Sequence, residues 1–126
     1  MNRPPMRLSS TVLGAPDARA LAAFYERLLG WHRVADEPGW VILRPSSGGT
    51  GLSFQTEPDF VPPAWPSSGA EQQMMMHLDI AVEDLQAGVA WAQEAGARLA
   101  GFQPQEHVRV MLDPAGHPFC LFRGEV

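Results

Sequence analysis

The chain has 126 residues, of which 45% are hydrophobic and 18% charged, so it is long enough for a globular domain and too apolar to be disordered throughout. Fourteen acidic and nine basic side chains give a net charge of −5, and no Lys/Arg cluster is present to neutralise phosphates, which argues against a nucleic-acid partner. No apolar run is long enough to cross a membrane, and the single cysteine fits a reducing compartment, so we expect a cytoplasmic protein with no membrane partner.

The first half of the chain predicts one helix between strands. A strand at 8–15 is followed by Asp17, whose side chain can accept from the free N–H groups that begin a helix. Apolar residues at helical spacing continue to Gly30, the expected left-handed stop. The order is therefore βαβββ, with the three later strands predicted at 31–35, 40–44 and 51–56.

The second half repeats this order after a connection at 57–73, where four prolines disfavour both helix and strand pairing. When Asp84 is laid on Asp17 as the start of a helix, His77 falls on Ser10. The sequence thus predicts one domain made of two tandem modules, at about 7–56 and 74–123. The second module is expected to contain strands at 73–82, 98–103, 108–113 and 118–123 and a helix at 84–95.

Alternation along the predicted strands assigns their side chains to two faces of a sheet. Leu78 and Ile80 are expected to pack on a helix, which leaves His77 and Asp79 on the opposite face. The same argument along the other strands predicts a largely apolar cavity, enclosed by both modules, with a few polar groups, as is usual for small-molecule pockets. The predicted ligand-binding residues are Trp40, Ile42, Gln55, His77, Asp79, Arg109, Met111, Cys120 and Phe122.

Three motifs then suggest a family: FYERLLGW at 24–31, HLDIAVEDL at 77–85 and DPAGHPFCLF at 113–122. With the paired βαβββ modules, they resemble the vicinal oxygen chelate superfamily, which includes glyoxalase I, bleomycin-resistance proteins and extradiol dioxygenases. The similarity is closest to small actinobacterial glyoxalase-like domains. It implies an α+β fold in which two βαβββ modules form a strongly curved, incompletely closed eight-stranded mixed sheet around a cavity.

The resemblance also implies four positions for a divalent metal, taken from the first and last strands of each module. Here these positions are Ser10, Gln55, His77 and Cys120. A hydroxyl and a neutral amide coordinate weakly, and the carboxylates that would balance the charge of the ion are missing. Cys120 could join His77 as a soft pair for zinc, but a catalytic zinc takes three protein ligands. We therefore expect no metal cofactor, with zinc as the alternative.

Several candidate residues have two interpretations. His77 is either a hydrogen-bonded interior histidine or a group that contacts the ligand and shuttles a proton. Asp79 is either neutralised by Arg109 or Arg44, or it awaits a cationic or donor group on the ligand. Cys120 is either a small buried hydrophobe or a thiol in contact with His77. Core packing is the default for Trp40, Met111 and Phe122, although an aromatic ring in the cavity could equally stack on a planar ligand.

Two classes of function fit these residues. The first is metal-independent binding of a small, aromatic or cationic molecule, as in drug-sequestering proteins that resemble this chain in lacking metal ligands. The second is a lyase, isomerase or dioxygenase with an atypical metal site, or with acid–base catalysis by His77 and Asp79. A third interpretation is a collapsed pocket and a dimerising role alone. The resemblance implies a homodimer, for which Trp65 in the linker is either an exposed anchor or part of a plain spacer.

Overall fold

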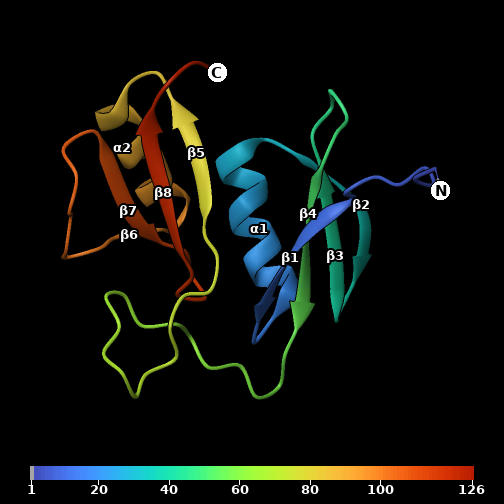
Figure 1. Cartoon of the computed structure of the whole chain (residues 1–126), viewed down its shortest axis with the longest axis horizontal. Helices are drawn as coiled ribbons and strands as arrows, with labels where there is room; N and C mark the ends of the chain where they lie inside the picture. Colours follow the sequence, from blue (N-terminus) through green and yellow to red (C-terminus); the bar gives the residue numbers. More distant parts are fainter. Residues whose placement is uncertain (1) are drawn as a thin grey trace. The chain divides into compact units, whose positions relative to one another are not determined.

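The computed structural model describes residues 2–126, which form two compact units, one up to Pro58 and the other from Asp59 to Val126 (Figure 1). Each unit has the order βαβββ, and each contains a four-stranded mixed sheet with one helix. The predicted α+β class and tandem modules are therefore confirmed. The boundary after Pro58 falls inside the predicted linker, and the remainder of that linker belongs to the second unit. No helix within residues 2–126 has the length and apolarity needed to cross a membrane.

The first unit is built around a well-capped helix. Asp17 accepts hydrogen bonds from the backbone N–H groups of Arg19 and Ala20, at 3.0 and 3.3 Å, and Gly30 ends the helix with a φ of 71°. The strand order is β1-β4-β3-β2, with β1 parallel to β4 and the other neighbours antiparallel. The elements are β1 (Ser10–Ala15), α1 (Ala18–Leu29), β2 (His32–Glu37), β3 (Trp40–Arg44) and β4 (Gly51–Thr56).

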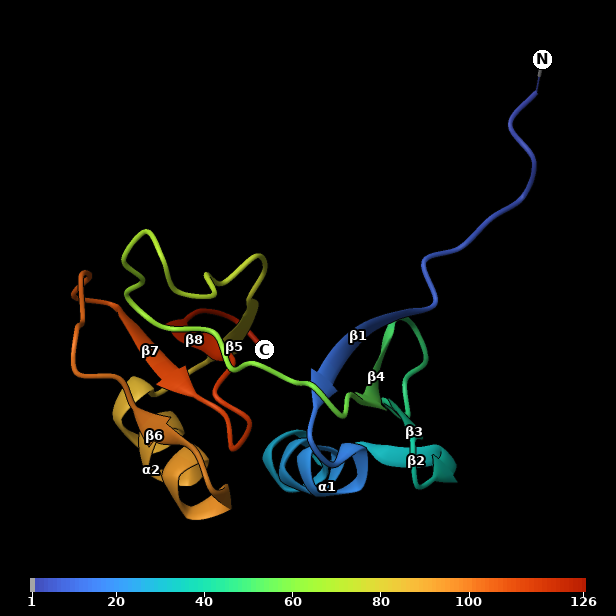
Figure 2. The ribbon, with the colours of Figure 1, turned by 90° about the horizontal axis from the view of Figure 1, so that it is seen from below.

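The apolar stripe of α1 packs on one face of this sheet (Figure 2). Phe24 and Tyr25 are fully buried, and the ring of Tyr25 stacks on Phe54 of β4 with 5.6 Å between the ring centroids. Val41 and Leu43 of β3 are also buried on this face. The helical spacing in the sequence thus produces the core of the first unit.

The second unit has the sheet order β5-β8-β7-β6, with β5 parallel to β8. Its helix starts at Asp84, which accepts from the N–H of Ala87, and ends at Gly96. In Figure 2 this helix lies against one face of the sheet, while the linker segment at 59–73 crosses the other. The elements are β5 (Leu78–Val82), α2 (Leu85–Ala95), β6 (Arg98–Leu99), β7 (Val108–Leu112) and β8 (Pro118–Arg123).

Two strands of the second unit are shorter than predicted. β5 begins at Leu78, so the three methionines before it lie in an extended segment. β6 contains only Arg98–Leu99. The N–H of Ala100 still donates to the carbonyl of Val110, and the side chain of Gln103 makes further bonds at this point. Its amide nitrogen donates to the carbonyls of Ala100 and Val110, and its amide oxygen accepts from the N–H of Val110. One side chain therefore fixes the loop after β6 to β7.

Candidate functional site

In the first unit, the predicted site residues share the sheet face opposite α1. Trp40 pairs with Gln55 and Ile42 with Ser53 across β3 and β4, which confirms the predicted face for these strands. The hydroxyls of Ser10 and Ser53 share a hydrogen bond of 2.6 Å. The amide of Gln55 donates to Glu57 at 2.8 Å. These polar groups are therefore bound to their own neighbours: Ser10 to Ser53, and the exposed Gln55 to Glu57.

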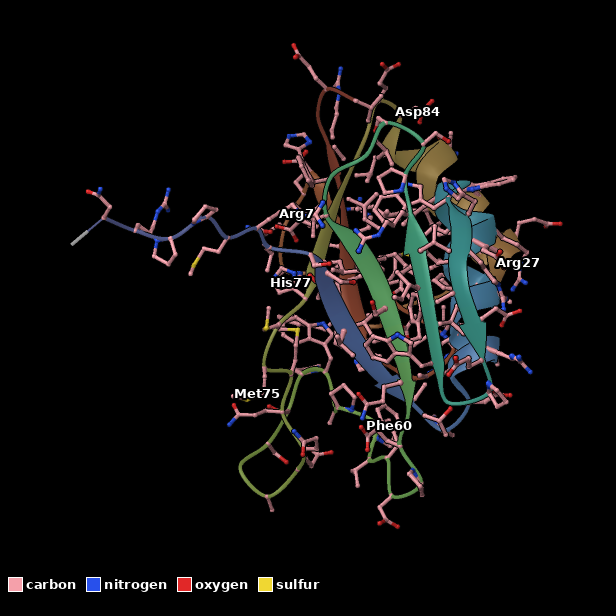
Figure 3. All side chains as sticks on the ribbon, turned by 90° about the vertical axis from the view of Figure 1, so that its right-hand side faces the viewer. Arg7, Arg27, Phe60, Met75, His77 and Asp84 are labelled. Carbon is pink, nitrogen blue, oxygen red and sulfur yellow. The ribbon has the colours of Figure 1, made fainter. Side chains whose placement is uncertain are left out.

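In the second unit, four predicted site residues come together on the face away from α2. Asp79 of β5 lies directly opposite Cys120 of β8, and Phe122 is two residues further along the same face. His77 immediately precedes β5, where Figure 3 labels it, and its Nδ1 lies 3.0 Å from Oδ1 of Asp79. The strand alternation predicted for β5 and β8 is therefore correct, and it assembles an imidazole, a carboxylate and a thiol.

The predicted face of β7 is wrong. Met111 pairs with Phe119 and Arg109 with Leu121, so both lie on the face that packs against α2. Met111 is fully buried there. Val110 pairs with Cys120 and so lies on the cavity face, where the sequence predicted Arg109 and Met111. Four of the five residues of β7 are apolar, so alternation in the sequence did not distinguish the two faces.

The same finding decides the alternatives for Asp79. The guanidinium of Arg109 donates to the backbone carbonyls of Gln105, Glu106 and Val108, at 2.9–3.2 Å, and so fastens the loop before β7. Arg44 donates within its own unit, to the carbonyls of Ser9 and Gly49 and to the Ser9 hydroxyl. Within residues 2–126 no arginine pairs with Asp79, whose carboxylate contacts the Nδ1 of His77. The carboxylate is 59% exposed and available to a ligand.

Cys120 is not activated as a nucleophile. Burial is the main cause that raises the pKa of its thiol, and the charge of Asp79 and a hydrogen bond with that carboxylate raise it further. The thiol therefore stays protonated near neutral pH, and nucleophilic catalysis by Cys120 is disfavoured. Both interpretations of Cys120 are partly correct, because the residue is half-buried and also lies beside Asp79 and His77.

A cavity of about 360 Å³ lies over this face of the second unit. Trp65 from the linker forms part of its wall and is half-buried, with its ring 6.4 Å from that of Phe102. A dimer contact through Trp65 stays a prediction. The Nε1–H of Trp65 is buried and has no hydrogen-bond partner among the residues that the structure describes. The lining consists of Trp65, His77, Asp79, Pro104, Gln105, Val108, Val110, Cys120 and Phe122.

Five of these lining residues were not predicted from the sequence. Val108 and Val110 were missed because the face of β7 was misassigned. Its true face follows from its pairing with β8, in which Val110 lies opposite Cys120. Pro104 and Gln105 belong to a loop with no periodic pattern. For Trp65 the sequence indicated a dimer anchor or a plain spacer, not a place in the cavity wall. Exposed Met75 and Met76 lie outside the cavity wall, and the predicted dimer contact through them stays a prediction.

A larger hollow, of about 600 Å³, lies on the opposite side of this unit, along α2. It is less suited to specific recognition, because its one charged lining residue, Arg109, already donates to three carbonyls. The smaller cavity instead has a carboxylate, an imidazole and a thiol beside aromatic rings, which matches the usual make-up of ligand pockets. We therefore place the candidate site there.

The four metal positions that the resemblance implies do not fit a hard divalent ion. Ser10 is hydrogen-bonded to Ser53 and Gln55 to Glu57, and both offer only neutral oxygens as ligands. Cys120 holds a proton, and none of the four positions carries a carboxylate. Ions such as Mg²⁺ and Ca²⁺ bind through charged oxygen ligands, so this donor set lacks what they require.

The comparisons with known proteins agree with this fold. The sequence profile of the Glyoxalase-like domain family matches residues 10–122, which is most of the chain. The chain belongs to the glyoxalase-like domain family. A search of curated proteins finds no match to this sequence.

Solved structures of similar fold come from the glyoxalase/bleomycin resistance/dioxygenase group. A family enzyme from Burkholderia phytofirmans PsJN has a TM-score of 0.69 at 20% identity, covering 94% of this glyoxalase-like chain and 98% of its own. An antibiotic binding protein from Streptomyces sp. CB03234 has a TM-score of 0.64 at 21% identity, and the match covers 98% of this chain and 100% of that protein. A lactoylglutathione lyase from Agrobacterium tumefaciens has a TM-score of 0.60 at 17% identity, and the match covers 97% of this chain and 96% of that protein. At these identities the likeness establishes the shared fold, and the narrower resemblance to actinobacterial members stays a prediction.

Proposed function

We propose that this glyoxalase-like protein binds a small planar molecule with a cationic or hydrogen-bond-donating group in the cavity of the second unit, without the help of a metal. The observation that carries the proposal is the carboxylate of Asp79, which lies on the cavity wall with no arginine partner among residues 2–126. A carboxylate beside apolar surface favours an opposite charge or a donor. The similarity to an antibiotic binding protein supports a binding role on this fold.

The other walls of the cavity define the rest of the ligand. Trp65 and Phe122 offer aromatic surface, and Val108 and Val110 offer aliphatic surface. Aromatic faces attract both planar rings and cations. His77 holds the carboxylate from one side through its Nδ1 contact and so orients it toward the remaining space. A volume of about 360 Å³ is at the lower end of ligand pockets, so we expect a molecule of two or three fused rings.

The experiment compares two probes with one ring system. 9-Aminoacridine is a cation near neutral pH, whereas acridine is largely neutral at pH 8. We expect the wild-type protein to prefer the cation, and we expect Asp79→Asn to weaken the cation about tenfold while leaving acridine unchanged, since a charge-assisted hydrogen bond contributes about 1.5–3 kcal/mol and exposure reduces this. Fluorescence titration measures both affinities.

A matched control variant is Asp59→Asn, which removes an exposed carboxylate outside the cavity lining. It should change neither affinity. If Asp79→Asn and Asp59→Asn weaken the cation equally, the effect is one of net charge and the proposed role of Asp79 is wrong. If neither probe binds the wild-type protein at concentrations near 1 mM, the proposal of a planar-ligand pocket is contradicted.

A second candidate function is acid–base catalysis, and it is favoured by the 3.0 Å contact between His77 and Asp79. A carboxylate that holds one imidazole nitrogen orients the ring and leaves the other nitrogen available for proton transfer. Such a pair could remove a proton next to a carbonyl. Exchange of the methyl protons of pyruvate in deuterated water, followed by NMR, tests this. Exchange that His77→Gln does not reduce would exclude the pair as the base.

A further inference from the structure

The polar cluster on the cavity wall also has the composition of a zinc site. His77, Asp79 and Cys120 each present one donor atom, and these three atoms lie within 4.8 Å of one another. Imidazole nitrogen, carboxylate oxygen and thiolate sulfur are the protein ligands that zinc takes, and three of them with an open fourth position form a typical reactive site. We propose that these three side chains bind one zinc ion, with its fourth position open to the cavity.

The backbone already holds the three residues in a suitable arrangement. Asp79 and Cys120 are direct partners in the β5–β8 ladder, and His77 lies two residues before Asp79 on the same side. A tetrahedral zinc with bonds of about 2.0–2.3 Å separates its donor atoms by roughly 3.5 Å. The present separations, from 3.0 Å for His77 and Asp79 to a limit of 4.8 Å, approach this value, so rotation of side chains would suffice.

Charge supports the same ion. Zinc brings two positive charges, which the carboxylate of Asp79 and the thiolate of Cys120 would balance, while His77 binds as neutral imidazole. On binding, the thiol of Cys120 gives its proton to solvent as the zinc–sulfur bond forms. A soft sulfur ligand with imidazole favours zinc over magnesium or calcium. No arginine pairs with Asp79 among the described residues, so no resident cation has to be displaced.

This donor set differs from the arrangement that the family resemblance implies. All three ligands come from one unit. His77 and Cys120 are two of the four implied positions, whereas Asp79 is none of them. The site is therefore independent of Ser10 and Gln55 in the other unit. The zinc site uses the same carboxylate, Asp79, as the proposed ligand site. Zinc and an organic cation should consequently exclude each other.

The first experiment measures metal binding on the whole chain. Protein treated with a chelator and then dialysed against zinc should retain one zinc per chain by elemental analysis, and magnesium should not compete. Cobalt in place of zinc should give a thiolate charge-transfer band in the near ultraviolet and strong visible bands of a tetrahedral ion. Cys120→Ser should abolish the charge-transfer band, and Asp79→Asn and His77→Gln should each weaken zinc at least tenfold.

The controls remove the same chemical groups elsewhere. His107 and Asp59 are exposed residues of the same unit and line no part of the cavity, so His107→Gln and Asp59→Asn should bind zinc as the wild type does. Equal losses in control and site variants would overturn the site. So would a cobalt spectrum without a sulfur band, or zinc retained at much less than one per chain.

A readout on the unaltered chain covers the case in which a variant fails to fold. Cys120 is the only cysteine, so alkylation by iodoacetamide reports on one thiol. Zinc should slow this alkylation at least tenfold, and a chelator should restore it. Unchanged alkylation overturns the proposal. Zinc should also displace 9-aminoacridine; if the dye does not bind but zinc does, the proposed function falls while the zinc site stands.

Discussion

The two units have the same order of elements but place different chemistry on the sheet face away from the helix. In the first unit this face carries Ser10 hydrogen-bonded to Ser53, and the exposed Gln55. In the second it carries His77 against Asp79, beside a cavity. The two helices also differ in how many side chains they bury. Five side chains of α1 are buried, among them two aromatic rings, whereas α2 buries only two alanines.

This comparison suggests a division of roles. The polar groups of the first unit are bound to their neighbours, and its aromatic core lies under α1, so its local structure is explained by packing. The second unit has an exposed carboxylate and a cavity on the face away from its helix, and packing within the unit requires neither of them. Groups that stability does not explain are the better candidates for function.

The largest expected effect tests this division directly. Phe54→Ala should lower the free energy of unfolding by about 3–5 kcal/mol, because a fully buried ring that stacks on Tyr25 leaves a cavity. Phe122→Ala, which removes a half-buried ring from the cavity wall, should lower it by less than about 2 kcal/mol. Denaturant unfolding measures both. Equal losses would show that the wall of the cavity is as much a core as the inside of the first unit.

The turns that follow the third strand of each unit give the next comparison. In the second unit the buried carboxylate of Asp113 accepts from the N–H groups of Ala115 and His117, both at 3.0 Å. Asp113→Ala should lower the free energy of unfolding by about 2–3 kcal/mol, because it leaves these donors without that acceptor. In the first unit Arg44→Ala should lower it by less than about 1 kcal/mol, since its bonds to Ser9 and Gly49 are exposed to water. Thermal unfolding at pH 7 checks the order, and a reversed order would contradict it.

These contrasts show what the sequence could and could not predict. Helix ends were predictable because Asp17 and Gly30 act through local backbone geometry. The faces of β3, β4, β5 and β8 were predictable because apolar and polar residues alternate there. The face of β7 was not, because Val-Arg-Val-Met-Leu is apolar at four of five positions and its register is set by β8. The side chain of Arg109 was misassigned for the same reason.

The candidate site was predictable to a similar degree. Alternation assigned His77, Asp79, Cys120 and Phe122 to inward faces of their strands, and the pairing of β5 with β8 in the structure brings them together. The closing wall could not, because Trp65 reaches the cavity from a segment without secondary structure of its own. Long-range contacts of this kind depend on how the loop folds back, which no local pattern encodes. From the sequence, Asp79 was interpreted as a partner for arginine, as a contact for the ligand or as an acid–base partner of His77, so it was not included among the metal-binding positions.

The helix caps provide a smaller and sharper comparison. Asp17 accepts from two N–H groups and Asp84 from one. Asp17→Ala should therefore lower the free energy of unfolding by about 1 kcal/mol, and Asp84→Ala by roughly half of that. Asn at either position keeps an acceptor and should recover most of the loss. If Asp84→Ala costs more than Asp17→Ala, the number of accepted bonds does not determine the strength of these caps.

The smallest expected effect concerns two carboxylates whose pKa values are lowered by different kinds of partner. The pKa of Asp36 is lowered mainly by the hydrogen bond from Arg19, with a further contribution from Arg33. The pKa of Glu71 is lowered by the hydroxyl and the N–H of Ser68, which are neutral. In both cases the folded pKa is below the unfolded value of 3.8 or 4.5, so the stabilisation is present above that value and is lost as the pH falls through the folded pKa.

Salt should distinguish these two carboxylates. Asp36→Asn should slightly reduce stability at pH 7 in dilute buffer and have no effect in about 1 M salt, where the screening length falls to roughly 3 Å. Glu71→Gln should lose the same small amount in both conditions, because hydrogen bonds from neutral donors depend little on ionic strength. Both differences should vanish below the folded pKa, where the wild-type carboxylates are protonated. Urea unfolding at two salt concentrations and two pH values measures this, and a salt-resistant effect of Asp36→Asn would mean that geometry rather than charge joins β2 to α1.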